Sequence, residues 1–309
     1  MRVLVTGGAG FIGSHVVDAL RSGGHEVVVL DNLSHGSREV LPPSVPFIEG
    51  DILEPDQWVA AVGSVDVVIH LAAQIRVEYA ESHPEVDVRT NVEGTVRILQ
   101  AARALGAREI RFASSAAVYG DNPHVPLAED ATCAPISYYG LDKWTGEHYV
   151  RFEESRGGLA AVILRLANVY GPRQRTAGEG GVVAVFAEAL ARGDRPWIHG
   201  DGQQTRDFIS VWDVARAFTH RLGSPEASGT YNIGTETATT VNTLWQHLAQ
   251  IAGVDVKAVR YGPARPGDIR HSRLRTARAR QWGFEPRVPL VEGLRLTYED
   301  FVARAHAAP

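Results

Sequence analysis

The chain has 309 residues, more than the roughly 250 to 300 at which a single hydrophobic core stops growing, so we expect one large α/β domain or two closely joined domains. Its 44% hydrophobic and 22% charged residues are ordinary for a globular protein and exclude disorder or a coiled coil. The 36 acidic and 31 basic residues give a formal charge of −5, which argues against a general nucleic-acid-binding protein.

Cysteine, hydropathy and histidine spacing narrow the setting further. Cys133 is the single cysteine, which excludes an internal disulfide and favours a reducing, cytoplasmic location. No apolar run approaches the ~18 residues of a membrane span, so no membrane association is expected. The 12 histidines lack paired metal-ligand spacing, so no metal is expected, and His15 and His70 are interpreted as packing or hydrogen-bonding residues.

Short β-branched runs alternate with helical patterns along the first half of the chain. The sequence predicts strands over residues 2–5, 26–30, 46–49, 65–70, 109–113 and 160–166, and helices over 11–22, 56–62, 85–105 and 137–155. The strand at 65–70 is a nearly continuous apolar run, which is typical of a parallel strand covered on both faces. We therefore predict an α/β fold, a Rossmann-like doubly wound parallel sheet with a smaller C-terminal substrate-binding domain.

The pattern loosens after residue 167. Glycines at 178, 180 and 181 precede a predicted helix that ends near residue 192, and residues 211–222 and 231–234 are expected to return to the sheet. These features predict one domain over 1–167 plus about 211–235, and a second over 168–210 and 236–309. Five arginines between residues 270 and 280 are interpreted as a solvated helix rather than a nucleic-acid site.

A glycine-rich turn follows the first predicted strand and opens the first predicted helix. Gly7, Gly10 and Gly13 are three residues apart, a spacing that permits a tight turn, close approach to a diphosphate and close helix packing. Asp31 ends the second predicted strand, where its carboxylate can bind ribose hydroxyls and repel a 2′-phosphate. Together these features predict a dinucleotide site that prefers NAD to NADP.

Tyr139 and Lys143 are four residues apart on a predicted helix, so they lie on the same face. A nearby ammonium ion would favour the tyrosine phenolate and tune it toward a general base. Lys143 and Lys257 are the only lysines among 31 basic residues, which makes a lysine at this position informative. Ser114 and Ser115 follow a buried strand, so their hydroxyls are expected at the carboxyl edge of the sheet.

Motifs across nearly the whole chain resemble the extended short-chain dehydrogenases/reductases of the NAD-dependent epimerase/dehydratase superfamily. The resemblance is closest to the UDP-galactose (UDP-glucose) 4-epimerases and their N-acetylhexosamine relatives. The motifs that carry it are residues 6–15, 50–52, 70–74, 91–95, 114–120, 139–143, 165–172, 200–209, 232–234 and 265–268.

The resemblance implies roles for individual residues around the cofactor. Ser115 would hydrogen-bond the reacting sugar oxygen, Tyr139 would be the acid/base, and Lys143 would tune it and hold the nicotinamide ribose. The expected NAD-binding residues are Gly7, Gly10, Phe11, Ile12, Gly13, Asp31, Asn32, Ser34, Gly36, Asp51, Ile52, Leu71, Ala72, Ala73, Gln74, Asn91, Ser114, Tyr139 and Lys143.

On the substrate side the resemblance implies a UDP-sugar. Arg206 and Arg265 match two diphosphate-binding arginines, and Ser272 would border the sugar 2-position, where a small residue leaves room for an N-acetyl group. Tyr119 is either an aromatic wedge beneath the site or a substrate contact. The expected substrate-binding residues are Ser115, Asn168, Val182, His199, Arg206, Arg265, Asp268 and Ser272.

The resulting hypothesis is an NAD-dependent UDP-glucose 4-epimerase acting through a 4-keto sugar. A nucleotide-sugar 4,6-dehydratase or decarboxylase would need an acidic residue just after the serine, where this chain has Ala116 and Ala117. A UDP-glucuronate 4-epimerase would share the catalytic set and stays open, and so does the choice of base. Retention of the full catalytic set argues against a noncatalytic NAD-binding sensor. The resemblance also implies a homodimer formed by the helix after Glu85 and the helix that carries Tyr139.

Overall fold

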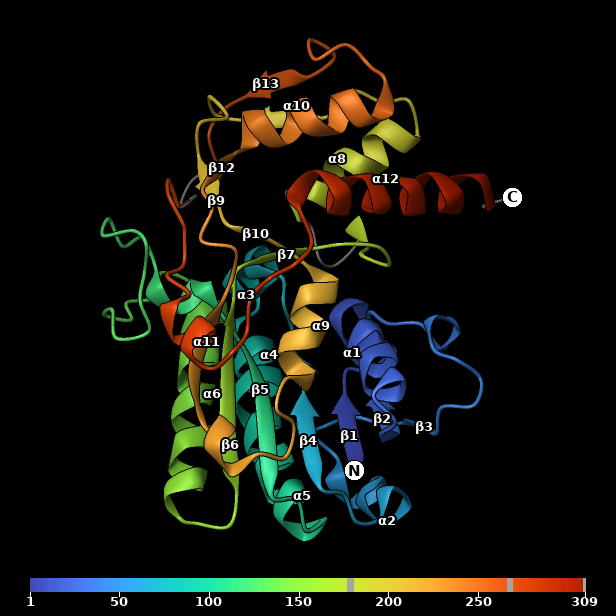
Figure 1. Cartoon of the computed structure of the whole chain (residues 1–309), viewed down its shortest axis with the longest axis vertical. Coiled ribbons are helices and arrows are strands. Elements are labelled where there is room, and N and C mark those ends of the chain that lie inside the picture. Colours follow the sequence, from blue (N-terminus) through green and yellow to red (C-terminus); the bar gives the residue numbers. More distant parts are fainter. Residues whose placement is uncertain (177–180, 266–268, 308–309) are drawn as a thin grey trace.

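The computed structural model describes residues 1–176, 181–265 and 269–307. Its main sheet has seven parallel strands in the spatial order β11-β6-β5-β4-β1-β2-β3 (Figure 1). The predicted α/β fold with a doubly wound parallel sheet is confirmed, and strand order switches direction between β1 and β4. The strands are β1 (Arg2–Thr6), β2 (Glu26–Asp31), β3 (Phe47–Glu49), β4 (Val67–His70), β5 (Glu109–Ser115), β6 (Ala160–Leu166) and β11 (Gly229–Ile233).

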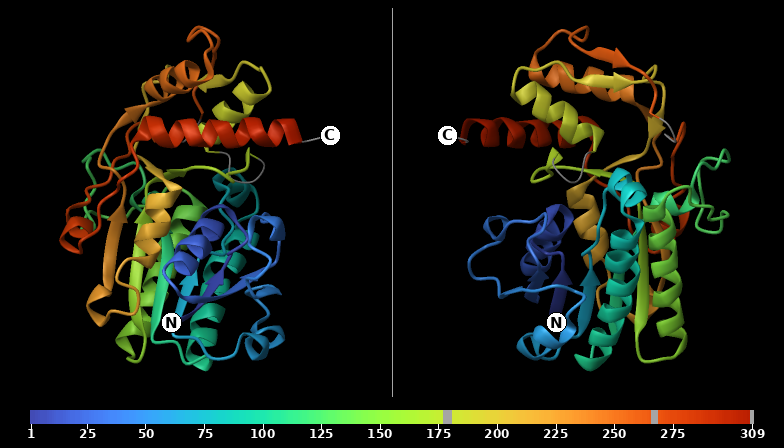
Figure 2. Two further views of the ribbon diagram at one scale, coloured as in Figure 1. Left: turned by 45° about the vertical axis from the view of Figure 1, so that its right-hand side comes forward. Right: turned by 180° about the vertical axis from the view of Figure 1, so that it is seen from behind.

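Alternate residues of the central strands pack into two hydrophobic cores, one on each face of the sheet. In β1, Val3 and Val5 belong to the first core, whereas Leu4 belongs to the second. Both faces are therefore covered, as the continuous apolar strands predict (Figure 2). The first face is covered by α1 (Phe11–Ser22) and α9 (Val211–Thr219), and the second by α2 (Val59–Val62), α5 (Gly94–Ala104) and α6 (Tyr138–Ser155).

The helix expected over 85–105 is interrupted by a wider turn. Helix α4 (Pro84–Val88) continues into a π-helical turn, η3 (Arg89–Glu93), before α5 begins. Asn91 lies in this turn, and its side-chain oxygen accepts a hydrogen bond from the backbone N–H of Gln74 at 2.9 Å. The spacing of hydrophobic residues in the sequence does not reveal that one turn of a helix contains an extra residue. Such π-helical turns occur frequently at functional sites.

A second group of elements, here called the cap, lies beyond the carboxyl ends of the strands (Figure 1). Its helices share one core in which Phe186, Trp245 and Leu294 are buried. The cap consists of α8 (Val182–Ala191), α10 (Val241–Ala252), α12 (Leu290–Ala307) and the paired short strands β7 (Asn168–Tyr170) with β10 (Phe208–Ser210), β8 (Trp197–His199) with β13 (Arg260–Gly262), and β9 (Thr205–Arg206) with β12 (Thr239–Thr240).

The chain returns from the cap to the sheet twice, since α9 packs along α1 and β11 pairs with β6. The other short helical segments are η1 (Arg38–Val40), η2 (Pro55–Gln57), α3 (Val77–Ser82), η4 (Ala116–Tyr119), η5 (Pro225–Ala227) and α11 (Ala277–Gln281). Among the described residues, no helix combines the length and apolar character needed to cross a lipid bilayer.

The solvated helix expected for the arginine-rich run at 270–280 is wrong for most of its length. Only α11 is helical there. His271 and Leu274 instead form isolated β-bridges with Thr205 and Leu127. These long-range pairings hold the segment extended, and local arginine spacing cannot reveal them.

Candidate active site

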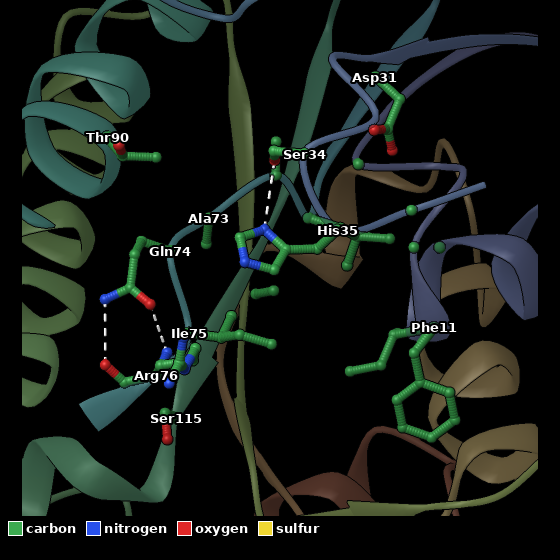
Figure 3. A pocket seen from close by; sticks show the side chains of 18 of the residues that line it. Phe11, Asp31, Ser34, His35, Ala73, Gln74, Ile75, Arg76, Thr90 and Ser115 are labelled. Atoms are coloured by element: carbon green, nitrogen blue, oxygen red, sulfur yellow. Dashed lines mark hydrogen bonds between the residues drawn. The ribbon is translucent and has the colours of Figure 1, made fainter. Parts of the chain in front are cut away.

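A cavity of about 650 Å³ opens where the parallel strands end. Its walls come from the segments that follow β1, β2, β3, β4, β5 and β6, so the topological switch point lies at its floor. Figure 3 shows Asp31 on one side of this cavity, and Gln74, Arg76 and Ser115 on the other. This separation leaves room for an extended ligand between the two groups.

The glycine loop between β1 and α1 is packed too tightly for other residues at two positions. Gly7 has φ = 69°, and a Cβ there would lie 2.7 Å from the backbone nitrogen of Ala72. A Cβ on Gly13 would overlap the carbonyl oxygen of Gly7. Gly10, by contrast, caps α1 without a side-chain hydrogen bond and lines the cavity, so the first N–H groups of the helix are available to an anion.

Asp31 closes the loop at the end of β2. Its two carboxylate oxygens accept hydrogen bonds from the backbone N–H groups of Ala9 at 2.9 Å and Leu33 at 2.8 Å. Burial raises the pKa of Asp31 above its usual value, while these hydrogen bonds act in the opposite direction. The neighbouring Asn32 donates to Asp51 at 3.2 Å, which connects the ends of β2 and β3. The glycine loop, with helix N–H groups that can bind a diphosphate, and the adjacent Asp31 carboxylate, which can bind a ribose, fit two parts of a dinucleotide.

Ser115, Tyr139 and Lys143 meet at the other end of the cavity. Ser115 ends β5, and its hydroxyl, which accepts the Ala117 backbone N–H at 3.1 Å, lies close enough to the Tyr139 phenol to influence its pKa. Helix α6 brings the other two residues there, because Ser137 caps its first turn through a 3.1 Å hydrogen bond from the Gly140 N–H. The Lys143 ammonium lies 5.9 Å from the centre of the Tyr139 ring.

The environment shifts both ionisable groups of this trio. Burial raises the pKa of Tyr139 to about 12; the Ser115 hydrogen bond opposes the rise and the charge of Asp87 adds to it. Burial lowers the pKa of Lys143 to about 8, against the favourable charges of Asp87 and Asp142. Lys143 is therefore still mostly an ammonium ion at pH 7, and Tyr139 is a neutral phenol.

The cavity brings together nearly all of the residues expected to bind the cofactor. Figure 3 draws lining side chains as sticks and labels Phe11, Asp31, Ser34, Ala73 and Gln74 among them. The expected cofactor residues that line the cavity are Gly7, Gly10, Phe11, Ile12, Gly13, Asp31, Asn32, Ser34, Gly36, Asp51, Ile52, Leu71, Ala72, Ala73, Gln74, Ser114, Tyr139 and Lys143. Asn91 does not line it, because it is buried behind Gln74 and bonds both backbone polar groups of that residue.

The expected substrate residues are distributed differently. Ser115 and Asn168 line the cavity, whereas Val182, His199, Arg206, Arg265 and Ser272 do not, and Asp268 lies outside the described residues. The Arg265 guanidinium pairs with Glu78 of α3 at 3.6 Å, and the backbone N–H of Ser272 donates to the Thr205 carbonyl at 3.1 Å. These contacts fix two cap segments without bringing their side chains into the cavity.

Other aromatic and histidine residues have structural contacts. Tyr119 is fully buried and donates a 2.7 Å hydrogen bond to Asn232, so it is a wedge beneath the site. A ring nitrogen of His15 bonds the Pro172 carbonyl at 3.0 Å, and one of His70 bonds the Thr6 hydroxyl at 2.8 Å. Both histidines are packing residues, as the sequence indicates.

The sequence analysis missed several residues of the cavity wall. Ile75, Arg76 and Tyr79 follow the end of β4, and Gln174 returns to the cavity after β7. The first three could have been found by extending the strand-end rule beyond Gln74. Gln174 gives no such signal, because its position depends on a turn within the cap.

A model of the NAD dependent epimerase/dehydratase family matches residues 3–234, and the chain belongs to this family. The resemblance inferred from the motifs is thereby confirmed, together with NAD as the cofactor.

Individual relatives match nearly the whole chain. The UDP-glucose 4-epimerase of Mycolicibacterium smegmatis is 42% identical, over 97% of this chain and 98% of the relative. The structure of a UDP-glucose 4-epimerase from Thermotoga maritima with UDP-glucose is also 42% identical, with a TM-score of 0.93 over 98% of this chain and 99% of that one. The Thermus thermophilus UDP-glucose 4-epimerase in complex with NAD is 39% identical, with a TM-score of 0.90 over 97% and 99%.

Proposed function

We propose that this protein catalyses the NAD-dependent 4-epimerisation of a UDP-hexose, with UDP-galactose and UDP-glucose as the reference pair. The observation that carries the proposal is the meeting of Ser115, Tyr139 and Lys143 at the end of a cavity whose opposite end is a dinucleotide cradle. The relatives named above support the same reading.

NAD fits the cavity because the glycine loop leaves helix N–H groups free for its diphosphate and Asp31 provides the carboxylate for a ribose. When bound, NAD would supply a hydride acceptor for C4 of the sugar and a hydride donor to the opposite face, so the net redox change would be zero. Tyr139, at the far end, is placed to take the proton that the hydroxyl on the same carbon must lose and later to return it.

The three side chains have distinct tasks in this proposal. The Tyr139 oxygen takes the proton of the 4-hydroxyl and later gives it back, and the Ser115 hydroxyl holds the same sugar oxygen. Because the pKa of Tyr139 is about 12 in the protein alone, the phenol needs positive charge nearby to act as a base at neutral pH. Lys143 provides one such charge one helix turn away, and the positive nicotinamide ring of bound NAD would add a second.

The residues next to Ser115 favour epimerisation over elimination or decarboxylation. Ala116 and Ala117 begin η4 directly after the serine, and methyl groups cannot move a proton. UDP-glucuronate is the second candidate substrate, because Arg76 lines the same cavity and a guanidinium suits a sugar carboxylate.

The direct test incubates the purified protein with NAD and either UDP-galactose or UDP-glucuronate, and follows the C4 epimer by chromatography. We expect the wild type to form UDP-glucose from UDP-galactose. The Tyr139→Phe variant should form the epimer more slowly by the ~10²- to 10⁴-fold typical of general acid/base groups. If only UDP-glucuronate gives a C4 epimer, UDP-glucuronate replaces the UDP-hexose as the proposed substrate. Loss of water or carbon dioxide from either sugar would refute epimerisation.

The proposal includes a homodimer through α6 and the α4–α5 stretch. Large apolar side chains are exposed there, including Phe152 at 58%, Val88 at 45%, Leu141 at 43% and Tyr149 at 42%. Light scattering at micromolar concentration is expected to give twice the chain mass, and a monomer would contradict the dimer. We also propose that residues 1–167 and about 211–235 form one domain and that residues 168–210 and 236–309 form the other. A cytoplasmic location is part of the same proposal.

A further inference from the structure

A buried ion pair joins α6, the helix of Tyr139 and Lys143, to the strand β6. Glu147 lies on α6, one turn beyond Lys143, and Arg165 lies on β6. Arg165 donates from Nε to Glu147 Oε1 at 2.9 Å and from Nη2 to Oε2 at 2.7 Å. Both side chains are buried. A two-pronged contact of this kind fixes direction as well as distance, so it ties α6 to β6 in one orientation.

The same carboxylate holds the end of the strand that carries Ser115. The Ser114 hydroxyl donates a hydrogen bond to Glu147 Oε1. Ser114 is buried and directly precedes Ser115 at the end of β5. Its hydroxyl proton is therefore used within the protein, although the family resemblance implies that Ser114 contacts NAD. Glu147 thus belongs to the helix that carries Tyr139 and bonds the strand that carries Ser115.

The other side of the Arg165 guanidinium is also bonded within the fold. Its Nη1 donates to the Tyr119 hydroxyl at 2.9 Å and to the Glu129 carbonyl at 3.1 Å. The Tyr119 hydroxyl donates to Asn232 of β11 at 2.7 Å. Buried charges are costly to desolvate, and a fully bonded network of this kind is rigid. The carboxylate that holds Ser114 is therefore itself held in place.

A second buried ion pair on the same strand provides a comparison. Glu109 and Arg111 pair at the start of β5, and Arg111 Nη1 also donates to the His220 carbonyl at 2.8 Å. Both side chains are buried, and neither residue lines the cavity. The two ion pairs are alike in burial but lie at opposite ends of β5. Comparing them separates an effect on stability from an effect on the site.

We propose that Glu147 is a positioning residue that anchors the end of β5 to α6 through Ser114. Arg165 holds the Glu147 carboxylate in place. The anchored strand end then sets the position of the Ser115 hydroxyl relative to Tyr139. A misplacement of about 1 Å can slow a reaction roughly 10²-fold. The effect of Glu147 on turnover rests on the function proposed above, whereas the anchoring of β5 does not.

Three variants separate anchoring from stability. Ser114→Ala removes only the hydroxyl that Glu147 holds and leaves the ion pair intact. The double variant Glu147→Leu/Arg165→Met replaces the ion pair by apolar side chains, a change that is often neutral or stabilising for buried pairs. Glu109→Gln breaks the ion pair at the other end of β5 and is the matched control.

Hydrogen exchange followed by mass spectrometry measures the anchoring without any substrate. Peptides that cover residues 112–117 should exchange at least about tenfold faster in Ser114→Ala and in the double variant than in the wild type, because the strand end opens more often. In Glu109→Gln the faster exchange should be confined to the start of β5. Unchanged exchange of residues 112–117 in Ser114→Ala would overturn the proposal.

Turnover provides the second measurement. We expect kcat to fall roughly 10- to 100-fold in Ser114→Ala and in the double variant, while KM for the UDP-sugar and the affinity for NAD stay within about twofold. Both variants should melt within a few degrees of the wild type. Glu109→Gln should melt at a clearly lower temperature and keep the wild-type kcat, because its ion pair lies away from the site.

The outcomes distinguish the ways in which the proposal can fail. Wild-type kcat in Ser114→Ala and in a stably folded double variant would show that the ion pair contributes stability alone. A loss of kcat in Glu109→Gln as large as that in Ser114→Ala would tie turnover to stability rather than to position. Either result overturns the proposal, and Ser114→Ala alone decides if the double variant does not fold. A wild-type protein without epimerase activity would refute the proposed function, and hydrogen exchange would still test the anchoring.

Discussion

The cofactor side and the cap side of this site are assembled in different ways. Every described residue that lines the main cavity lies between Gly7 and Gly181, mostly where a sheet strand ends. The expected contacts from β8, β9 and the segment around Ser272 lie outside that lining. A parallel sheet brings successive strand ends to one edge, whereas the cap positions its residues through short strand pairs between distant segments. The sequence therefore predicts the first side almost residue by residue, and the second only through family resemblance.

The largest expected effect tests the catalytic end of the cofactor side. Tyr139→Phe removes the phenol oxygen beside Ser115, so turnover should fall by the ~10²- to 10⁴-fold typical of general acid/base groups. NAD affinity by calorimetry and the melting temperature should stay close to wild type. Near-wild-type turnover would remove Tyr139 from the mechanism.

Lys143→Arg tests whether this position needs a compact cation. Lys143 is 4% exposed and its ammonium lies 5.2 Å from the centre of the Phe112 ring, so a wider guanidinium does not fit without displacement. We expect kcat to fall roughly 10- to 100-fold, because a displaced cation stabilises the Tyr139 phenolate less and so weakens the base. Lys257→Arg at an exposed position is the control and should be fully active. Equal activity of both variants would refute the special role of Lys143.

Cofactor choice tests the opposite end of the cavity. The Asp31 carboxylate should repel a 2′-phosphate, so NAD should bind at least about tenfold more tightly than NADP, a difference of about 1.4 kcal/mol. Asp31→Asn should reduce the difference in affinity between NAD and NADP, and Glu39→Gln, at an exposed position of η1, should not. Equal affinities of the wild type by calorimetry would contradict the ribose assignment.

Ser272→Tyr tests the cap side, where the sequence gives the weaker prediction. The backbone of Ser272 is bonded to Thr205, next to Arg206, so a large side chain there should hinder a bulky 2-substituent. We expect kcat/KM for UDP-N-acetylglucosamine to fall by the ~10- to 200-fold that pocket fit supplies, with UDP-glucose nearly unaffected. Ser272→Ala should keep both activities. An equal loss on both sugars would show that Ser272 does not select between them.

The smallest expected effect is on stability. Burial and the neighbouring Asp87 raise the pKa of Asp142 to about 7, above its unfolded value of 3.8. Stability gained from its protonation is therefore present below pH 4 and lost as the pH rises toward 7. Asp142→Asn has no such loss, so its melting temperature should exceed that of the wild type by a few degrees at pH 8 and by less at pH 5. A difference that does not change with pH would contradict the raised pKa.

How far the sequence could predict the molecule depends on whether a feature is local. The strand that contains Val3 and Leu4, the glycine loop and the helix start at Tyr138 follow from nearby residues alone, and their positions agree with the structure to within a residue or two. The widened turn around Asn91 and the extended segment before Ala277 do not, because each is stabilised by partners far away in the chain.

The same distinction applies to the site. Tyr139 and Lys143 could be found from one helix, and Asp31 from one strand end. The two hydrogen bonds by which Asn91 holds the backbone of Gln74 join a helical turn to a strand end, and no spacing pattern connects these residues. Gln174 enters the cavity wall from a turn of the cap for the same reason.

The return of the chain from the cap to the sheet affects the order in which the protein can fold during synthesis. When residues 1–167 have left the ribosome, β6 still has an open edge, because its neighbour β11 is not yet made. Val16 and Val17 of α1 likewise lack Phe218 of α9, which completes their core. An unpaired strand edge and an uncovered apolar face invite association with other chains. The nascent chain must therefore remain protected until Ile233 has emerged, and a fragment ending at residue 167 is expected to aggregate rather than fold.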